Sequence, residues 1–204
     1  MTVVIVTVMA DFSSLNIKNA MVRKTKKALF LDRDGVLNLD DGYTHEFAHE
    51  QIMGGSIELI KFANKQNFKV LVITNQAGIG RGFYSEKSFH KYMKDLGLYY
   101  KQFSAVIDDY YFAPFYRNSK YKKYLRGETL RKPNTGMIEI AKNKYNLDLK
   151  NSILVGDKIS DIQAGHRSQI KNLILFGNNS ENISEEFKFF KVQSLYEILD
   201  LPVW

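Results

Sequence analysis

The chain has 204 residues, of which 45% are hydrophobic and 25% are charged, so it is long enough for one folded domain with a buried core. It contains no cysteine, which excludes disulfides, thiolate zinc sites and a cysteine nucleophile. The net charge of +7 favours anionic ligands, either phosphorylated metabolites or nucleic acid, and charge alone does not choose between them.

The first residues read as a separate region. Residues 1–9 are apolar, but no basic segment precedes them and they are too few to span a bilayer, so we do not read them as an export signal. Residues 10–20 show no clear periodicity. We therefore expect residues 1–26 to be a dispensable extension of a single domain that spans residues 27–204. We expect a cytoplasmic monomer without membrane contact.

Short apolar runs recur along the rest of the chain, and each is typical of a strand that is buried on both faces of a parallel sheet. These runs are residues 28–31, 70–73, 105–107, 152–155 and 173–176. A helix that is capped by Ser56 and runs to about Gln66 is expected between the first two runs.

The most regular helical pattern follows Ser85. Apolar residues recur there at spacings of three and four, at Phe89, Tyr92, Met93, Leu96, Tyr100 and Phe103. Further helices are expected from about Gly136 and around Asp161. Because strands alternate with helices, the crossovers should be right-handed, and the sequence predicts a doubly wound α/β fold with a parallel sheet.

Acidic residues follow the first apolar run at once. Asp32 and Asp34 lie one residue apart at its end, and Gly35 allows the chain to turn directly after them. The carboxyl ends of parallel strands line the crevice in which open α/β folds bind their ligands. Carboxylates gathered there need a cation, and such a site suits Mg²⁺ and phosphate.

Other polar side chains are expected at the same edge of the sheet. Thr74 ends the second run, Asp157 follows a later one, and Lys132 lies in a loop before a helix. Phosphoryl transfer mainly requires positioning and neutralisation of charge, so a metal, a cationic side chain and a hydroxyl around a phosphate make chemical sense together.

Four segments resemble, in the same order, the four motifs of haloacid-dehalogenase-type phosphatases. They are residues 30–35, 74–76, 131–133 and 155–158. More narrowly, Asn38 and residues 42–43, 78–82 and 136–137 resemble the branch that contains D-glycero-D-manno-heptose 1,7-bisphosphate 7-phosphatases and histidinol-phosphatase. The resemblance covers roughly residues 27–176. It implies a Rossmann-like core without a cap domain and with a loop insertion at about residues 113–130.

The resemblance also implies a mechanism. Asp32 would be the nucleophile that becomes an aspartyl-phosphate, and Asp34 would protonate the departing oxygen and then accept a proton from the attacking water. Mg²⁺ would be bound by the carboxylates of Asp32 and Asp157 and by the backbone carbonyl of Asp34.

Thr74 and Lys132 would hold the phosphate oxygens, and Asp161 would orient Lys132 or Lys158 without binding the metal. The residues implied to contact the substrate are Asp40, Asp41, Gly42, Tyr43, Asn75, Gln76, Arg131 and Lys158.

The chain departs from the heptose branch in one loop. That branch typically carries a zinc-binding loop of three cysteines and a histidine, and the matching positions here are Ala113, Phe115, Glu128 and Leu130. These side chains cannot rebuild a thiolate site, so we do not expect zinc. Aromatic packing could order the loop instead, through Phe112, Phe115, Tyr116, Tyr121 and Tyr124.

The same loop carries a run of basic side chains that could either bind a second phosphate or stay solvated. They are Arg117, Lys120, Lys122, Lys123 and Arg126.

Two further patterns are rejected. Residues 45–49 match the H-E-x-x-H zinc-protease pattern, but this segment closely follows Gly42 and Tyr43 and no third ligand is evident, so surface histidines are the better interpretation. The glycines at positions 78, 80 and 82 are read as a tight turn and not as a dinucleotide site.

The sequence thus predicts a Mg²⁺-dependent sugar-phosphate phosphatase, with heptose 1,7-bisphosphate as substrate during synthesis of nucleotide-activated heptose for surface lipopolysaccharide. Histidinol-phosphatase is one alternative, and a phosphatase of 3′-phosphorylated nucleic-acid ends is another, although we do not expect a nucleic-acid partner. A phosphoacceptor signalling module is disfavoured, because Asp34 is placed to activate water and would shorten the life of an acyl-phosphate.

Overall fold

The computed structural model describes residues 25–178 and 188–204. This part of the chain forms a six-stranded sheet in the order β3-β2-β1-β4-β5-β6, and every pair of neighbouring strands is parallel. The strands are β1 (Ala28–Leu31), β2 (Lys69–Asn75), β3 (Asp109–Ala113), β4 (Ile153–Gly156), β5 (Asn172–Phe176) and β6 (Phe190–Val192). The α-helices are α1 (Ser56–Lys65), α2 (Ala77–Arg81), α3 (Glu86–Gln102), α4 (Gly136–Tyr145) and α5 (Ile159–Arg167).

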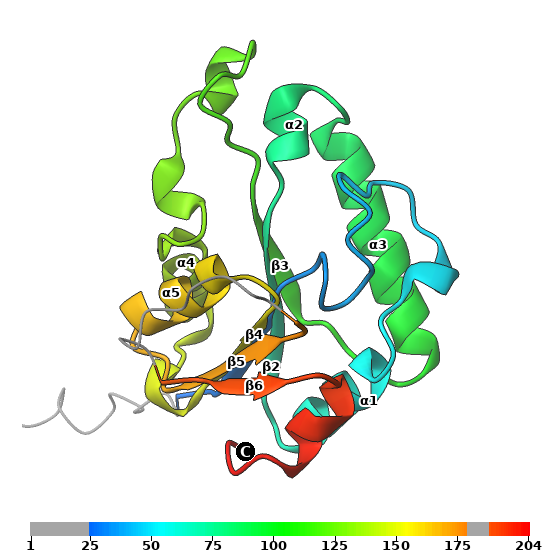
Figure 1. Cartoon of the computed structure of the whole chain (residues 1–204), viewed down its shortest axis with the longest axis vertical. Coiled ribbons are helices and arrows are strands. Elements are labelled where there is room, and N and C mark those ends of the chain that lie inside the picture. Colours follow the sequence, from blue (N-terminus) through cyan, green and yellow to red (C-terminus); the bar gives the residue numbers. More distant parts are fainter. Residues whose placement is uncertain (1–24, 179–187) are drawn as a thin grey trace, which may run out of the picture.

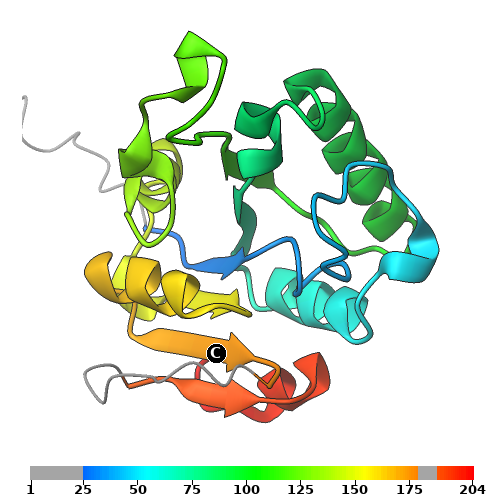
Figure 2. The same ribbon diagram turned by 45° about the horizontal axis from the view of Figure 1, so that its top comes forward.

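Helices cover both faces of the sheet (Figures 1 and 2). Side chains alternate along β1, so Leu29 and Leu31 pack in the core under α1 and α3, whereas Phe30 packs in the core under α4 and α5. β1 lies between β2 and β4, with Phe30 in register with Leu71 on one side and Leu154 on the other. The predicted doubly wound α/β fold is confirmed.

The prediction for the third strand was wrong. Residues 105–107 precede β3 and are not in a strand, and the Val106 side chain is exposed. The strand begins only at Asp109, and its first four residues are half-buried. β3 lies at the edge of the sheet, where one side of a strand meets solvent, so it lacks the continuous apolar run that marks a central strand.

The second error concerns the start of α1. The residue that caps this helix is Gly55, at φ 85°, and Ser56 is already helical. The Ser56 hydroxyl instead donates a hydrogen bond to the Met53 carbonyl, at 2.6 Å. The cap predicted for α3 is confirmed, because the Ser85 hydroxyl accepts from the backbone N–H of Ser88, at 3.0 Å.

Most of the proposed N-terminal extension lies outside the described residues. Lys26 is already part of the fold, because its N–H donates to the Asn146 carbonyl at 3.1 Å and its carbonyl accepts from the Asp148 N–H at 2.8 Å. Across residues 25–178 and 188–204, none of the helices combines the length and the apolar character needed to cross a membrane.

Candidate active site

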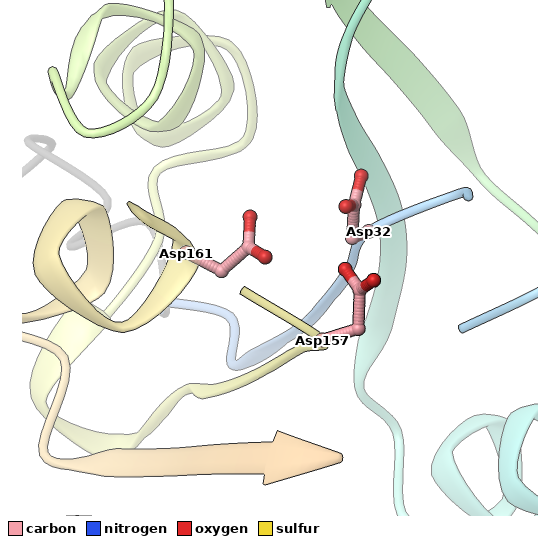
Figure 3. Close-up of side chains that lie close together, drawn as sticks. All are labelled: Asp32, Asp157 and Asp161. Carbon is pink, nitrogen blue, oxygen red and sulfur yellow. The ribbon is translucent and has the colours of Figure 1, made fainter. Parts of the chain in front are cut away.

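Three strands deliver polar side chains to the carboxyl edge of the sheet. Asp32 follows β1 and is tied to β4 by a hydrogen bond from its N–H to the Val155 carbonyl, at 3.0 Å. Thr74 lies near the end of β2, and Asp157 directly follows β4. Asp161, in the first turn of α5, points toward the same place (Figure 3). One carboxylate oxygen from each of Asp32, Asp157 and Asp161 lies within 4.8 Å of the others.

The turn after Asp34 requires a glycine. Gly35 has a φ of 87°, and a Cβ at this position would overlap the carboxylate of Asp157. The turn is closed by a hydrogen bond from the Gly35 N–H to the Asn38 carbonyl, at 2.7 Å. The glycine therefore lets the two acidic segments approach each other.

Lys132 holds this cluster together from the loop before α4. Its ammonium group lies 2.8 Å from Asp32 and 2.5 Å from Asp161, and it also donates to the Ile73 carbonyl at 2.9 Å. Asn75 fixes the backbone of Lys132 from both sides, accepting from its N–H at 3.0 Å and donating to its carbonyl at 3.1 Å. Burial lowers the pKa of Lys132, but Asp161 and Asp32 outweigh burial and raise it, so the side chain stays charged.

The three carboxylates outnumber this lysine and are largely buried. Burial raises the pKa of Asp32, with Lys132 opposing it. Burial and the charge of Asp32 raise the pKa of Asp157 to about 7. A cation between Asp32 and Asp157 would relieve this repulsion, and hard carboxylate oxygens are the donors that Mg²⁺ prefers. The residues present therefore fit a magnesium ion.

Asp161 is less available as a ligand. One of its oxygens is paired with the Lys132 ammonium, and the other accepts from the backbone N–H of Lys158, at 3.1 Å. This position is what the predicted orienting role of Asp161 requires.

Asp34 is held by hydrogen bonds to both of its carboxylate oxygens. One oxygen, Oδ2, accepts from the Gln76 side-chain amide at 2.9 Å. The same amide nitrogen donates to the Thr74 hydroxyl at 2.8 Å, and the side-chain oxygen of Gln76, Oε1, accepts from the Tyr84 hydroxyl. The other oxygen, Oδ1, accepts from Arg33 and Asn38. Gln76 thus links Asp34 to Thr74.

A cavity of about 510 Å³ opens above these groups. The predicted site residues that line it are Asp32, Asp34, Asp40, Gly42, Tyr43, Thr74, Asn75, Gln76, Arg131, Lys132, Lys158 and Asp161. Asp157 is not among the residues that line it. Asp41 does not line the cavity, and its exposed carboxylate accepts from the Gln51 amide at 2.8 Å. Sequence reasoning did not single out Arg81 and Tyr84, which also line the cavity.

Asp40 and Lys158 meet at the rim of this cavity. The Lys158 ammonium donates to the Asp40 carboxylate at 2.9 Å, and the Gly42 N–H donates to the second oxygen of Asp40 at 3.2 Å. Burial raises the pKa of Asp40, but Lys158 outweighs burial and holds it below its ordinary value.

Part of the cavity lining is basic. Arg81 and Arg131 both line it, and within the described part of the chain neither makes an ion pair with a carboxylate. The Arg81 guanidinium lies over the Tyr116 ring, 4.0 Å from its centroid. Burial and the neighbouring Arg81 lower the pKa of Arg131. Because the guanidinium groups of Arg81 and Arg131 have no acidic partner in the described chain, this part of the cavity is suited to binding an anion.

The basic residues of the long loop lie elsewhere. None of the five lines the active-site cavity. Lys123 is paired with Glu86, at 3.4 Å, and Arg117 lines an adjoining hollow.

The structure agrees with the rejection of a zinc-protease site. Residues 45–48 are not helical, and His49 begins a short 3₁₀ helix (His49–Gln51). The His45 ring stacks on Tyr84, at 4.9 Å, whereas His49 lies near Tyr99, at 6.4 Å. The two histidines therefore do not share a helix face.

A parallel α/β sheet with this acidic pair, threonine and lysine at its carboxyl edge defines a phosphatase of the haloacid-dehalogenase-like class. Residues 27–188 match the family model described as polynucleotide kinase 3 phosphatase, and the chain belongs to that family.

Two relatives and one solved structure show the extent of the similarity. The D-glycero-alpha-D-manno-heptose-1,7-bisphosphate 7-phosphatase of Burkholderia mallei is 43% identical over 149 residues, which are 73% of this chain and 79% of the relative. The D-glycero-beta-D-manno-heptose-1,7-bisphosphate 7-phosphatase of Pasteurella multocida is 36% identical over 177 residues, 87% of this chain and 95% of the relative.

The solved structure is a D,D-heptose 1,7-bisphosphate phosphatase from B. bronchiseptica, complexed with magnesium and phosphate. It superposes with a TM-score of 0.71 at 24% identity, over 85% of this chain and 96% of that one, and thus shares the fold.

Proposed function

We propose that this protein is a Mg²⁺-dependent phosphatase that removes the C7 phosphate of D-glycero-D-manno-heptose 1,7-bisphosphate. We assign it to the cytoplasmic synthesis of nucleotide-activated heptose for lipopolysaccharide. The observation that carries the proposed chemistry is the convergence of Asp32, Asp34, Thr74 and Lys132 on one cavity. The names of the relatives support the proposed substrate.

The proposed reaction has two steps. In the first, a carboxylate oxygen of Asp32 attacks phosphorus in line, the bond from phosphorus to the sugar oxygen breaks, and Asp34 gives its proton to that oxygen. In the second, Asp34 takes a proton from a water that attacks phosphorus and releases inorganic phosphate from Asp32. Both residues then return to their starting states.

Other side chains prepare the phosphate for this attack. The Thr74 hydroxyl and the Lys132 ammonium would hold its remaining oxygens, and Lys132 is already fixed by Asn75 and Asp161. Mg²⁺ bound by Asp32, Asp157 and the Asp34 carbonyl would supply positive charge that offsets the repulsion between nucleophile and phosphate.

The basic end of the cavity favours a bisphosphate. Arg81 and Arg131 line the same cavity as Asp32, and they lack acidic partners in the described chain. A second phosphate would satisfy both guanidinium groups. Histidinol phosphate carries a cationic amine in place of a second phosphate, so it fits this end poorly.

The test is a substrate panel. Phosphate release should be compared for both anomers of heptose 1,7-bisphosphate, for histidinol phosphate and for a 3′-phosphorylated oligonucleotide, the last suggested by the family description. We expect one anomer of the bisphosphate to give the highest kcat/KM. A higher value for the oligonucleotide, falling steeply as salt is added, would instead indicate an enzyme that processes nucleic-acid ends.

A further inference from the structure

Arg33 lies between the two aspartates of the first motif but outside the cavity that they line. Its exposed fraction is 0%, and it is the largest fully buried side chain in the described part of the chain. The guanidinium lies 4.6 Å from the centroid of the Tyr92 ring and 5.7 Å from that of Phe89, so α3 supplies aromatic rings that surround it. A buried charge is costly unless it is paired, so its partner identifies its role.

That partner is Asp34. Both Nε and Nη2 of Arg33 donate to the same oxygen, Oδ1, at 2.9 and 2.6 Å. The Asn38 amide donates to Oδ1 as well, at 3.1 Å. Nη2 also donates to the Thr44 carbonyl at 2.8 Å, which fixes the guanidinium against the segment after β1. One oxygen of Asp34 therefore accepts three N–H groups that all come from residues of this segment.

The second oxygen of Asp34 has a different environment. Among the described residues, Oδ2 accepts only from the Gln76 amide, at 2.9 Å, and that amide also donates to the hydroxyl of Thr74, which lines the cavity. Because Oδ1 is held by Arg33 and Asn38, the carboxyl group cannot rotate freely about its last bond. The orientation of Asp34 toward the cavity is thus set before a substrate binds.

We propose that Arg33 is a positioning residue for proton transfer: it holds Oδ1 of Asp34 so that Oδ2 is the oxygen that protonates the departing sugar oxygen. The inference rests on the proposed role of Asp34 as general acid. Arg33 itself does not line the substrate cavity, so its contribution passes through the position of Asp34 alone.

The experiment varies the basicity of the leaving group. A sugar alkoxide needs a proton to depart, whereas p-nitrophenolate does not, so loss of general-acid catalysis lowers kcat/KM for a sugar phosphate far more than for p-nitrophenyl phosphate. General-acid catalysis typically contributes about 10²–10⁴-fold. We expect Arg33→Met to lower kcat/KM about 100-fold for the sugar phosphate and only a few-fold for the aryl phosphate.

Two variants guard against a trivial loss of structure. Arg33→Lys keeps the buried charge but cannot offer two N–H groups in a fixed fork to Oδ1. It should therefore lower kcat/KM for the sugar phosphate about 10-fold and leave that for the aryl phosphate nearly unchanged. Tyr92→Phe is the matched control, because the buried Tyr92 hydroxyl has no hydrogen-bond partner among the described residues and the ring beside Arg33 remains. It should affect both substrates equally.

Equal losses for both substrates in a folded Arg33→Met or Arg33→Lys protein would overturn the inference. Asp34→Asn, measured with the same two substrates, separates this outcome from failure of the proposed function. The quantity compared is kcat/KM, which reports phosphoryl transfer to Asp32, because loss of the base in the second step lowers kcat for both substrates. If Asp34→Asn loses activity selectively and the Arg33 variants do not, only the inference about Arg33 is wrong. If Asp34→Asn also lowers both equally, the general-acid role itself is wrong.

Discussion

At the scale of single residues, the site is a balance of buried charges. Lys132 lies within 2.8 Å of both Asp32 and Asp161, whereas the Lys158 ammonium lies 3.6 Å from the carboxylate of Asp157. The raised pKa of Asp157 follows from burial and from the neighbouring carboxylate of Asp32. A divalent cation is therefore expected to compete with a proton for Asp157.

This competition predicts how magnesium binding depends on pH. Without metal the pKa of Asp157 is about 7, so at lower pH the ion must displace a proton. Calorimetric titration should show that affinity for Mg²⁺ weakens about tenfold for each pH unit below 7 and levels off above about pH 8. Asp157→Asn should bind Mg²⁺ weakly at every pH. Wild-type affinity that does not change with pH would contradict the assignment.

Arg81 allows a second test at this scale. Removing a charge-assisted contact to phosphate costs about 1.5–3 kcal/mol, so Arg81→Ala should raise KM for heptose 1,7-bisphosphate about 10–100-fold. It should leave KM for heptose 7-phosphate nearly unchanged. Lys122→Ala is the control from the basic loop, since Lys122 does not line the cavity. A selective effect of Lys122→Ala and none of Arg81→Ala would place the second phosphate at the loop instead.

Several of these residues could not be found from the sequence. Asp32, Thr74 and Asp157 were predictable because each follows an apolar run, and the ends of parallel strands meet at one edge. Arg33 carries no such signal, because its importance comes from burial under α3. Arg81 lies among glycines that the sequence analysis interprets as a tight turn. In the structure Gly78 and Gly80 are part of α2, and a Cβ on Gly78 would overlap Tyr84.

At the scale of elements, the loop between β3 and α4 is held by aromatic packing and hydrogen bonds. Tyr124 is 6% exposed, its hydroxyl donates to Glu86 at the start of α3 at 2.5 Å, and its carbonyl accepts from the Tyr116 N–H at 3.0 Å. The Tyr121 ring packs against Tyr124 edge-on, at 6.0 Å. These contacts connect the loop to a helix that also supports the active site.

Two tyrosines of this loop make a matched pair for a stability test. Tyr124→Phe removes the hydroxyl that binds Glu86 and should lower the free energy of unfolding by about 1 kcal/mol, measured by urea denaturation. Tyr121 is 41% exposed, and Tyr121→Phe should leave stability within about 0.5 kcal/mol of the wild type. Equal effects would mean that the hydrogen bond to Glu86 does not anchor the loop.

The sheet shows which elements a sequence reveals. β1, β2, β4 and β5 form the middle of the sheet, are covered on both faces, and appear as apolar runs. Of the edge strands, β3 was predicted at the wrong residues and β6 was not predicted, because partly exposed strands need not be apolar. The fold was predictable from its central strands because they fix the topology.

At the scale of the whole molecule, the described chain begins at residue 25, and Lys26 already hydrogen bonds to the segment after α4. Among the described residues, those of the core begin at Ala28 and those that line the cavity begin at Asp32. The expected monomeric state stays a prediction, as does the dispensable extension.

Deletion of residues 1–20 tests the domain boundary. We expect kcat/KM to stay within about twofold and the melting temperature within about 2 °C, because the deletion retains Lys26 and every described residue that lines the cavity. A large loss of either would show that the extension contributes to the fold or to the site.

The most direct measurement is to trap the covalent state of Asp32. The Asp34→Asn protein is mixed with Mg²⁺ and p-nitrophenyl phosphate. The phosphoryl group should transfer to Asp32, because p-nitrophenolate departs without a general acid. The aspartyl-phosphate should then persist, because the Asp34 carboxylate that would activate water is missing. Borohydride reduces an aspartyl-phosphate to homoserine, so mass spectrometry should find homoserine at position 32 and none in a matched Asp32→Asn protein. Release of one equivalent of nitrophenol per enzyme with Asp32 left unmodified would contradict the account.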